Sequence, residues 1–470
     1  MKNTKIILIA PKSPMGETYH PPLGLCYIRS YLQWKKGMNV PLLDLNLMPT
    51  KKLLKEVVES RPDIVGITCF SPNRFSSLDI GREIKELLPE AMVILGGIHV
   101  SFLYDQILRN FDFVDMVVRG EGEETLLELV DSLKEGDALD KIRGLAFRRF
   151  SDVVVNEKRE SIKDLDSLPF PTYIEHFVDF HGKRLRGASI ITSRGCSGGC
   201  KFCSVPGYWG KPRFRSTENI FEEMSILVNQ YHVEYVNFMD DTFTEDKERV
   251  ENLCSLMKRK NLNIKWRATA RVNTLDLEIL EIMKGAGCVE ISIGVESGNQ
   301  EILNRLGKRT SVEKIKDICK AIKELKIRLH ANFIVGSPGE NENTIEETKK
   351  IMRVIQPDTF NVSQSLYLFP GTALSKEFSK KGIYREAFWL DRNVSAVKYL
   401  AEHEEYILTR WQMELIKTGW KLLSFKKRVR YIWGILTWIK ISQVRKILFN
   451  LLNGGIQKLK KTLFHLMLSN

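Results

Sequence analysis

Short apolar runs alternate with helix-like segments along most of the chain, and this alternation limits the folds that the chain can adopt. In the first part, apolar runs of strand length lie at 5–11, 40–46, 63–70, 91–97 and 114–120. Helical patterns follow them at 23–35, 51–60, 76–89, 101–110 and 123–133. Such alternation predicts an α/β fold, a doubly wound parallel sheet with helices on both faces. We expect this sheet to form a domain over residues 1–138.

A second alternating run predicts a second domain over residues 186–400. Its expected strands lie at 188–193, 234–240, 264–270, 289–296, 329–336 and 359–367. The helical segments between them lie at about 217–231, 245–260, 275–286, 311–326 and 342–355. Six strand–helix units are too few for a closed eight-unit barrel, so we expect a partial (β/α)6 barrel. The prolines of "DLDSLPFPTY" (164–173) predict an extended linker over 139–185.

Three of the eight cysteines lie within one short stretch, "SRGCSGGCKFCS" (193–204). The spacing of Cys196, Cys200 and Cys203 would suit one face of a helix, but the glycines between them favour a loop. This loop follows the first barrel strand, at the functional end of the predicted barrel. Zinc would need a fourth ligand, and His181 and His232 are not at zinc-finger spacing.

The other five cysteines lie in apolar segments, where we expect them in the core: Cys26, Cys69, Cys254, Cys288 and Cys319. The first residues, "MKNTKIILIAPKS", lack the features of a secretory signal. We therefore expect a cytoplasmic protein in a reducing compartment. There, clustered cysteines are metal ligands or reactive thiols more often than disulfides.

The arrangement C-x3-C-x2-C, with Phe202 before the last cysteine, resembles the signature of the radical SAM superfamily. The resemblance implies that three thiolates hold three irons of a [4Fe–4S] cluster, while S-adenosylmethionine (SAM) chelates the fourth iron. It also implies that one electron from the cluster breaks the sulfonium C–S bond. The resulting 5′-deoxyadenosyl radical takes hydrogen from an unactivated carbon. The protein positions the cofactors and excludes water.

On the same resemblance, residues at the ends of the barrel strands are expected to bind SAM. Asp240 and Asp241 stand where most members of the superfamily bind the SAM amino end with glycines and a glutamate. Arg271 is expected to pair with the SAM carboxylate, with a surface salt bridge as the alternative. Glu296 is expected to meet the ribose hydroxyls, and the alternative is an acid that balances a helix dipole. The adenine-contacting loop would contain Gly336, Pro338 and Gly339.

The first domain resembles the cobalamin-binding subfamily of radical SAM enzymes. The phrases "PPLGL", "ILGGIHVS", "VVRGEGEETL" and "LDSLPFP" are typical of that group, and the resemblance extends from residue 1 to about residue 375. It implies a flavodoxin-like fold of the cobalamin-binding type. The residues assigned to cobalamin on this basis are Pro22, Leu23, Gly24, Asp44, Ser71, Gly96, Gly97, His99, Gly120 and Glu121.

The D-x-H-x-x-G loop that supplies an axial histidine in other cobalamin modules is missing, and "PKSPMGETYH" follows the first strand instead. Many members of the subfamily lack that loop too. His20 and His99 are the nearby histidines, and neither is expected to bind cobalt.

The subfamily contains radical SAM methyltransferases and the anaerobic magnesium-protoporphyrin ester cyclase. The resemblance therefore implies a cobalamin-dependent methyltransferase that acts on an unactivated carbon. Two alternatives stay open: a radical SAM cyclase or rearrangement enzyme, and a non-catalytic redox-sensing module at a membrane. The expected partners are a small-molecule or lipid-like substrate and a reduced ferredoxin or flavodoxin.

The positive charge is concentrated at the carboxyl-terminal end. Residues 411–470 contain twelve Lys and Arg against one Glu, or +11 of the net charge of +13, and the first 410 residues carry only +2. Basic residues interleaved with aromatic ones predict an amphipathic helical region over 401–470 that binds a membrane surface. A helical cap on the barrel is the alternative. No apolar run is long enough to span a bilayer. No nucleic-acid-binding motif is present. A tail on lipid would suit a hydrophobic substrate, such as an isoprenoid lipid, a hopanoid or a porphyrin.

Overall fold

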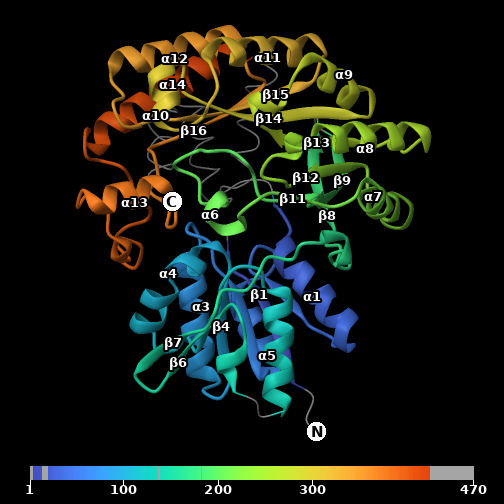
Figure 1. Cartoon of the computed structure of the whole chain (residues 1–470), viewed down its shortest axis with the longest axis vertical. Coiled ribbons are helices and arrows are strands. Elements are labelled where there is room, and N and C mark those ends of the chain that lie inside the picture. The colour runs from blue at the N-terminus through green and yellow to red at the C-terminus, as the bar shows by residue number, and fades with distance from the viewer. Residues whose placement is uncertain (1–3, 13–18, 136–137, 181–182, 424–470) are drawn as a thin grey trace, which may run out of the picture. The chain divides into compact units, whose positions relative to one another are not determined.

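The computed structural model of the protein describes residues 4–12, 19–135, 138–180 and 183–423 (Figure 1). The chain divides into two compact units, residues 1–416 and residues 417–470. The boundary falls inside the last described helix. Most of the predicted basic tail, from residue 424 onward, lies outside the described residues.

The first sheet contains five parallel strands in the order β2-β1-β3-β4-β5. These strands are β1 (Ile6–Ala10), β2 (Leu42–Asp44), β3 (Ile64–Thr68), β4 (Met92–Gly96) and β5 (Met116–Val118). The connecting helices are α1 (Leu23–Lys36), α2 (Thr50–Ser60), α3 (Arg74–Leu87), α4 (Ile98–Asn110) and α5 (Glu123–Glu135). The doubly wound fold is thus confirmed. The apolar strands fold in this way because helices cover them on both faces.

The stretch 139–185 is not a linker throughout, which corrects the prediction. A hairpin of β6 (Leu145–Arg149) and β7 (Asp152–Val155) continues the first sheet beyond β5, with antiparallel pairing. Leu145, Ala146 and Phe147 are buried in that sheet, which explains why this part of the chain is ordered as a strand. Strand β8 (His176–Phe180) belongs to the second sheet, where it pairs antiparallel with β9 (Lys183–Ile190).

The second sheet has the order β16-β15-β14-β13-β12-β9-β8, and its first six strands are parallel. The strands after β9 are β12 (Tyr235–Phe238), β13 (Lys265–Ala270), β14 (Cys288–Glu296), β15 (Arg328–Ile334) and β16 (Thr359–Ser363). The α-helices of this part are α6 (Val205–Trp209), α7 (Thr217–Tyr231), α8 (Lys247–Arg259), α9 (Leu277–Gly285), α10 (Gln300–Arg305), α11 (Val312–Glu324), α12 (Glu342–Ile355), α13 (Ala373–Lys380) and α14 (Glu405–Leu422). Six parallel strands with outer helices confirm the partial (β/α)6 barrel.

Two short strands and five 3₁₀ turns complete the described structure. Strands β10 (Ser193–Arg194) and β11 (Arg213–Phe214) form a separate antiparallel pair. The 3₁₀ turns are Leu139–Lys141, Leu165–Ser167, Phe243–Glu245, Val272–Thr274 and Glu386–Trp389.

The two faces of the second sheet differ in chemistry. Residues that point outward, such as Trp266, Leu329 and Phe333, are fully buried under the helices. The alternate residues point to the opposite side, which we call the inner face, and most of them are polar. This alternation is the pattern of a strand that is buried on one face only. The polar positions therefore line the inside of the barrel.

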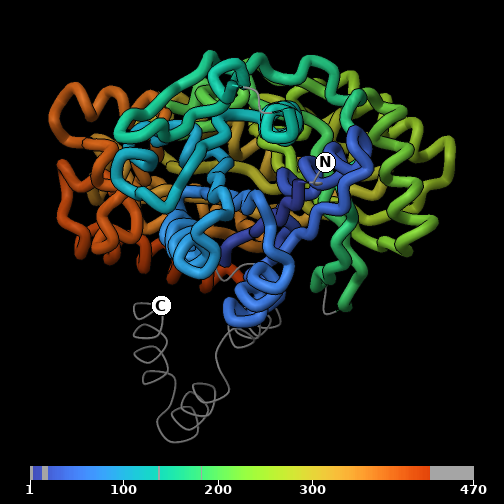
Figure 2. The backbone as a smooth tube through the Cα atoms, turned by 90° about the horizontal axis from the view of Figure 1, so that it is seen from below, coloured from blue at the N-terminus to red at the C-terminus, as the bar shows by residue number. Residues whose placement is uncertain are grey.

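The two sheets share one apolar core, although the sequence predicted separate domains. The core on the α3 and α4 side of the first sheet continues into residues of the second domain, among them Leu366, Leu374 and Trp389. Arg74 is 1% exposed and donates hydrogen bonds from Nε to the Trp389 carbonyl (2.8 Å) and from Nη1 to the Ser395 carbonyl (2.9 Å). Figure 2 shows the blue and cyan first domain in front of the green-to-orange second domain.

In the part of the chain that the structure describes, no helix combines the length and the apolar character needed to cross a bilayer.

Candidate cofactor site

The three clustered cysteines lie on the loop between β10 and α6. Their thiols are free and partly accessible, whereas the other five cysteines are buried core residues, as predicted. Burial raises the pKa of Cys203 to about 12, and the backbone N–H of Val205 opposes this rise. Burial also raises the pKa of Cys200, while Lys308 and Arg271 act in the opposite direction. Thiols of this kind bind metal as thiolates, so cations beside them favour metal binding.

Hydrogen bonds hold the first cysteine in place. The Cys196 Sγ atom lies 3.2 Å from Thr242 Oγ1 and accepts from the backbone N–H of Gly198 at 3.2 Å. Hydrogen bonds to sulfur are one of the means by which a protein sets the reduction potential of an iron–sulfur cluster. Gly198 packs so closely that an added Cβ would lie 2.5 Å from Arg271 Nη1. The glycines thus allow the loop to fold tightly around the sulfur atoms.

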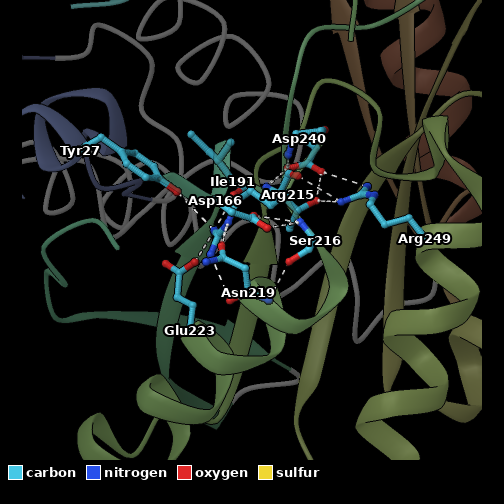
Figure 3. Close-up of polar contacts among 11 residues, drawn as sticks. Tyr27, Asp166, Ile191, Arg215, Ser216, Asn219, Glu223, Asp240 and Arg249 are labelled. Atoms are coloured by element: carbon cyan, nitrogen blue, oxygen red, sulfur yellow. Dashed lines mark hydrogen bonds and ion pairs between the residues drawn. The ribbon is translucent and has the colours of Figure 1, made fainter. Parts of the chain in front are cut away.

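Asp240 does not face the loop as a free ligand, which revises its predicted role. Its carboxylate accepts from the Thr192 N–H (2.6 Å), the Thr192 hydroxyl and the Ser193 N–H (3.3 Å). Arg249 lies on its other side, with Nη2 3.8 Å from Oδ2. Figure 3 shows Asp240 and Arg249 directed at the segment that also carries Ile191. Asp240 therefore fixes the strand end that leads into the cysteine loop.

A second buried pair supports the same segment from the other side. Arg215 is paired with Glu223 and donates from Nη1 to the Ile191 carbonyl at 2.9 Å (Figure 3). The same guanidinium group lies 3.3 Å from the Tyr27 hydroxyl of α1. The strand end before the cysteines is thus held by groups from both domains.

Asp241, next in sequence, has a different environment. Its side chain is solvent-exposed, yet protein atoms surround it on most sides, as on a concave surface. This partial loss of hydration and the nearby Asp240 raise its pKa to about 6, and the Gly195 N–H opposes the rise. Asp241 is therefore the acid of this pair that remains accessible to a ligand.

We expect Asp240→Ala to lower the free energy of unfolding by about 1–3 kcal/mol, because it leaves buried donors without an acceptor. Asp241→Ala is the matched control and should change that free energy by no more than about 0.5 kcal/mol, since the carboxyl is exposed. Urea unfolding followed by circular dichroism measures both. Equal effects of the two substitutions would contradict the positioning role of Asp240.

Glu296 ends β14 in a strained conformation and forms a buried ion pair. Its φ is +63°, in the region that non-glycine residues rarely adopt. Its Oε1 lies 3.1 Å from Lys308 Nζ, and both side chains are 9% exposed. Gly294 makes room for this pair, because an added Cβ would lie 2.1 Å from Glu296 Oε1. Backbone strain of this kind is concentrated at functional sites.

Arg271 lies between this ion pair and the cysteines. Its Nη2 donates to the Lys308 carbonyl at 3.3 Å, and its Nη1 adjoins Gly198. Lys308 had no predicted role. Lys308 directly follows Gly307 and lies three residues after the end of α10. No sequence motif marks this position.

The predicted adenine loop bends at two glycines with positive φ, Gly336 (+77°) and Gly339 (+78°). The buried Glu340 accepts the backbone N–H groups of Gly336 (2.5 Å) and Ser337 (3.2 Å). Burial raises the pKa of Glu340 to about 7 against the opposing effect of these two bonds. Pro338 accepts from Arg305 Nη1 at 3.2 Å. Glu340 thus shapes the loop, a role that the sequence did not indicate.

Phe202 was predicted to contact the cofactor, and its ring is held by the protein core. Its partly buried ring packs against the apolar core that the two domains share. The residue before the last cysteine therefore anchors the loop to that core.

The carboxyl-end edge of the first sheet contains open glycine positions. Around Gly24, and around Gly120 with its φ of +82°, an added Cβ would meet no atom of the described residues within 4 Å. Gly96 has one neighbour at 4.0 Å. By contrast, Gly97 is a close-packed turn at φ +107°, where a Cβ would lie 2.8 Å from the Cys69 carbonyl oxygen. Pro22 precedes α1, and Leu23 is buried in it.

Two other polar residues predicted at this edge have partners within the protein. Asp44 accepts from the Tyr19 hydroxyl (2.8 Å) and from the N–H of Asn46 (2.8 Å). His99 is 1% exposed and contacts the Ser71 hydroxyl through Nδ1 at 2.9 Å, while its Nε2 has no hydrogen-bond partner among the residues that the structure describes. Burial, reinforced by Arg74, lowers the pKa of His99 to about 3, so its ring is neutral.

Glu121 connects this edge directly to the cysteine loop. Its Oε1 lies 2.5 Å from Arg194 Nη1, and Arg194 Nη2 lies 2.5 Å from Glu123 Oε1. Arg213 Nη1 adds a contact of 3.1 Å with Glu121. Side-chain exposure in the Arg194 pairs is 4–6%. Burial alone would lower the pKa of Arg194, but Glu123 and Glu121 raise it above its usual value.

Comparison with known proteins identifies both halves of the chain. A model of the radical SAM superfamily matches residues 190–352, and a model of the B12-binding domain matches residues 16–130. A protein of Pyrococcus horikoshii named as an uncharacterized methyltransferase is 33% identical over 387 residues, with 80% of this chain and 83% of the relative covered. The chain belongs to the radical SAM superfamily, in the group that carries a cobalamin-binding domain.

Other radical SAM proteins extend this comparison. The anaerobic magnesium-protoporphyrin IX monomethyl ester cyclase of Cereibacter sphaeroides is 30% identical, with 76% of this chain and 60% of the cyclase covered. The solved structure of TsrM from Kitasatospora setae, a radical SAM methyltransferase with cobalamin and a [4Fe–4S] cluster bound, superposes with a TM-score of 0.69. It is 17% identical and covers 90% of this chain and 89% of that one, which shows a common fold.

The residues of this radical SAM protein fit the cofactors of the superfamily. Three free thiols on a glycine-containing loop, with cations beside them, form a donor set suited to a [4Fe–4S] cluster. At the first sheet, the open positions at Gly24 and Gly120 and the unpartnered, buried His99 Nε2 suit a large ligand along the carboxyl-end edge.

Proposed function

We propose that the protein is a cobalamin-dependent methyltransferase that acts on an unactivated carbon. The observation that supports this most strongly is the Arg194–Glu121 contact. It joins the carboxyl-end edge of the first sheet to a residue two positions before Cys196, which brings the residues proposed to hold the two cofactors close together. Relatives named as methyltransferases support the same reaction.

When bound, the cluster and SAM supply a 5′-deoxyadenosyl radical, and cobalamin supplies a methyl carrier. The residues of the chain hold and orient these groups. We assign Cys196, Cys200 and Cys203 to the cluster and Asp241 to the SAM amino group. Arg271 would meet the SAM carboxylate.

Two further segments would position SAM. Glu296, held toward the inner face by Gly294 and Lys308, would accept hydrogen bonds from the ribose hydroxyls. The loop from Gly336 to Gly339 would contact the adenine through its backbone. Three side chains predicted to bind cobalamin already have protein partners: Asp44, Ser71 and Glu121. They would therefore support cobalamin binding by fixing the loops around it.

The test uses anaerobically reconstituted protein loaded with cluster and cobalamin, with methyl-deuterated SAM and a chemical reductant. We expect mass spectrometry to detect both 5′-deoxyadenosine and S-adenosylhomocysteine. These products report the two uses of SAM, bond cleavage and methyl donation. Protein without reductant should form no 5′-deoxyadenosine.

The ring-forming or rearranging alternative is favoured by the likeness to the cyclase. It predicts 5′-deoxyadenosine without S-adenosylhomocysteine from the cobalamin-loaded protein. If neither 5′-deoxyadenosine nor S-adenosylhomocysteine formed, the result would favour the non-catalytic redox-sensing module. The three functions are thus separated by one measurement.

The proposed function also includes an electron donor and a location at a membrane surface. Reduced ferredoxin or flavodoxin would supply the electron, as radical SAM enzymes need a low-potential donor. The basic, aromatic composition of residues 411–470 supports contact with an anionic membrane surface.

A further inference from the structure

One row of residues crosses the inner face of the second sheet and is almost wholly polar. The strand register places Ser189 beside Asn237 and Asn237 beside Arg267. The row continues from Arg267 through Glu290 to Arg328. Neighbouring residues in parallel strands point to the same side of a sheet, so these five side chains share the inner face. Ser189 and Asn237 lie one position before the last residues of their strands, and Arg267, Glu290 and Arg328 lie three to six positions before theirs.

The charges of this row do not cancel. Arg267 Nη1 lies 3.3 Å from Glu290 Oε1, and Arg328 Nη1 lies 3.2 Å from Glu290 Oε2. Two guanidinium groups therefore share a single carboxylate. The two arginine side chains remain 30% and 27% exposed, whereas Glu290 is 9% exposed. Each guanidinium group has five N–H donors, so both retain donors for a ligand.

Two polar atoms of the row have no partner in the structure. Arg267 Nε and Ser189 Oγ are buried without a hydrogen bond to any residue of the described ranges, and Ser189 as a whole is 7% exposed. Buried polar atoms without partners are uncommon, and each calls for an explanation such as a missing ligand. Their positions on the same inner-face row as the two arginines place them around one region.

The first domain contributes a residue to this region. His20, on the loop after β1, has its Nδ1 atom 3.4 Å from Asn237 Nδ2. Its side chain is solvent-exposed although protein surrounds it on most sides, as for Asp241. Burial, together with the charges of Arg267 and His176, lowers the pKa of His20 to about 4. The ring is therefore neutral and able to donate or accept a hydrogen bond.

The next row toward the strand ends is also polar. The His330 ring contacts the Thr359 hydroxyl at 2.8 Å, and Asn332 donates to the Ser292 hydroxyl at 3.3 Å. Met239 adds a large apolar side chain that is 39% exposed, and the Phe180 ring lies 5.8 Å from the Arg328 guanidinium carbon. A hydrocarbon substrate would desolvate the two arginines and would offer no partner to Arg267 Nε or Ser189 Oγ, which costs free energy.

We propose that the Arg267–Glu290–Arg328 row, with Asn237 and His20, binds an anionic group of the substrate, a carboxylate or a phosphate on a small polar molecule. The planar guanidinium fork matches both anions. This assignment rests on the proposed function, since it places the anionic end of the substrate inside the barrel, before the strand ends that carry the proposed SAM site. It differs from the hydrophobic substrate that the basic tail suggested.

The test measures binding of simple anions to the reconstituted holoenzyme with SAM. Inorganic phosphate and succinate serve as probes in isothermal titration calorimetry, with glycerol as the neutral probe. We expect the wild type to bind both anions and not glycerol. Arg267→Met should weaken anion binding about tenfold or more, and Arg267→Lys should weaken it less because the charge remains. Arg259→Met, at the exposed end of α8, is the control and should bind like the wild type.

Three results would overturn the inference: no anion binding by the wild type, equal binding by wild type and Arg267→Met, or a response to phosphatidylglycerol vesicles without one to free phosphate. Circular dichroism of Arg267→Met and Arg267→Lys identifies a folding defect. If Arg267→Met is unfolded, the comparison of Arg267→Lys with the wild type provides the test. 5′-Deoxyadenosine formation by the same wild-type preparation reports on the proposed function separately. Its presence without anion binding would reject only the substrate class.

Discussion

Cys196→Ala is expected to abolish the iron–sulfur cluster and to reduce 5′-deoxyadenosine formation more than a hundredfold. Cys196 is one of only three thiols on the loop, and its sulfur is already held by Thr242 and the Gly198 N–H. Removing one thiolate leaves the cluster with two protein ligands and exposes an additional iron to solvent. Iron analysis and the visible spectrum of anaerobically purified protein measure the first effect, and chromatography measures the second.

Cys319→Ala is the matched control, since Cys319 is a free, fully buried cysteine in α11. It should retain the cluster and form 5′-deoxyadenosine at the wild-type rate. The small cavity left by the substitution should lower the free energy of unfolding by no more than about 1 kcal/mol. If Cys196→Ala kept a full cluster and cleaved SAM, or if Cys319→Ala lost the cluster, the ligand assignment would be wrong.

Arg194→Met is expected to lower the free energy of unfolding by about 3–5 kcal/mol. Glu123 would be left in the interior without its cation, and breaking one side of a buried ion pair costs this much. Because the pair joins the two cofactor edges, we also expect weaker binding of cobalamin. Thermal unfolding and cobalamin titration of the same preparation measure the two effects.

Arg392→Met is the control for a pair at the surface. Arg392 Nη2 lies 2.5 Å from Asp79 Oδ1, as close as Arg194 to Glu121, but the two side chains are 49% and 37% exposed. Its loss should cost no more than about 1 kcal/mol. Adding Glu123→Gln to Arg194→Met should recover part of the lost stability, because the unpaired charge is removed. Equal effects of the Arg194 and Arg392 variants would contradict the role of the buried pair.

The fold could be predicted because its elements are long, regular and apolar on the correct faces. The hairpin of β6 and β7 was missed because its strands are short and follow a loop, and prolines later in the same stretch suggested a linker. Pairing between distant segments, such as Arg74 with the Trp389 carbonyl, has no local pattern in the sequence.

The sequence predicted where the site residues lie in the fold, but it did not predict which protein groups they contact. Asp44, Asp240 and Glu121 stand at strand ends, where ligands bind, and so were assigned to cofactors. In the folded chain their carboxylates accept hydrogen bonds or ion pairs from neighbouring protein groups. Arg194, only two residues before Cys196, was not singled out, although two acids in "RGEGEE" required a cation once they became buried.

The central claim is that one chain holds a [4Fe–4S] cluster and cobalamin on facing edges. The most direct measurement is the content of iron, sulfide and cobalt per chain in anaerobically reconstituted protein. We expect about four iron atoms, about four sulfides and about one cobalt per chain. About four irons with no cobalt, even after reconstitution with cobalamin, would contradict the claim for the first domain, and loss of iron as well would contradict it altogether.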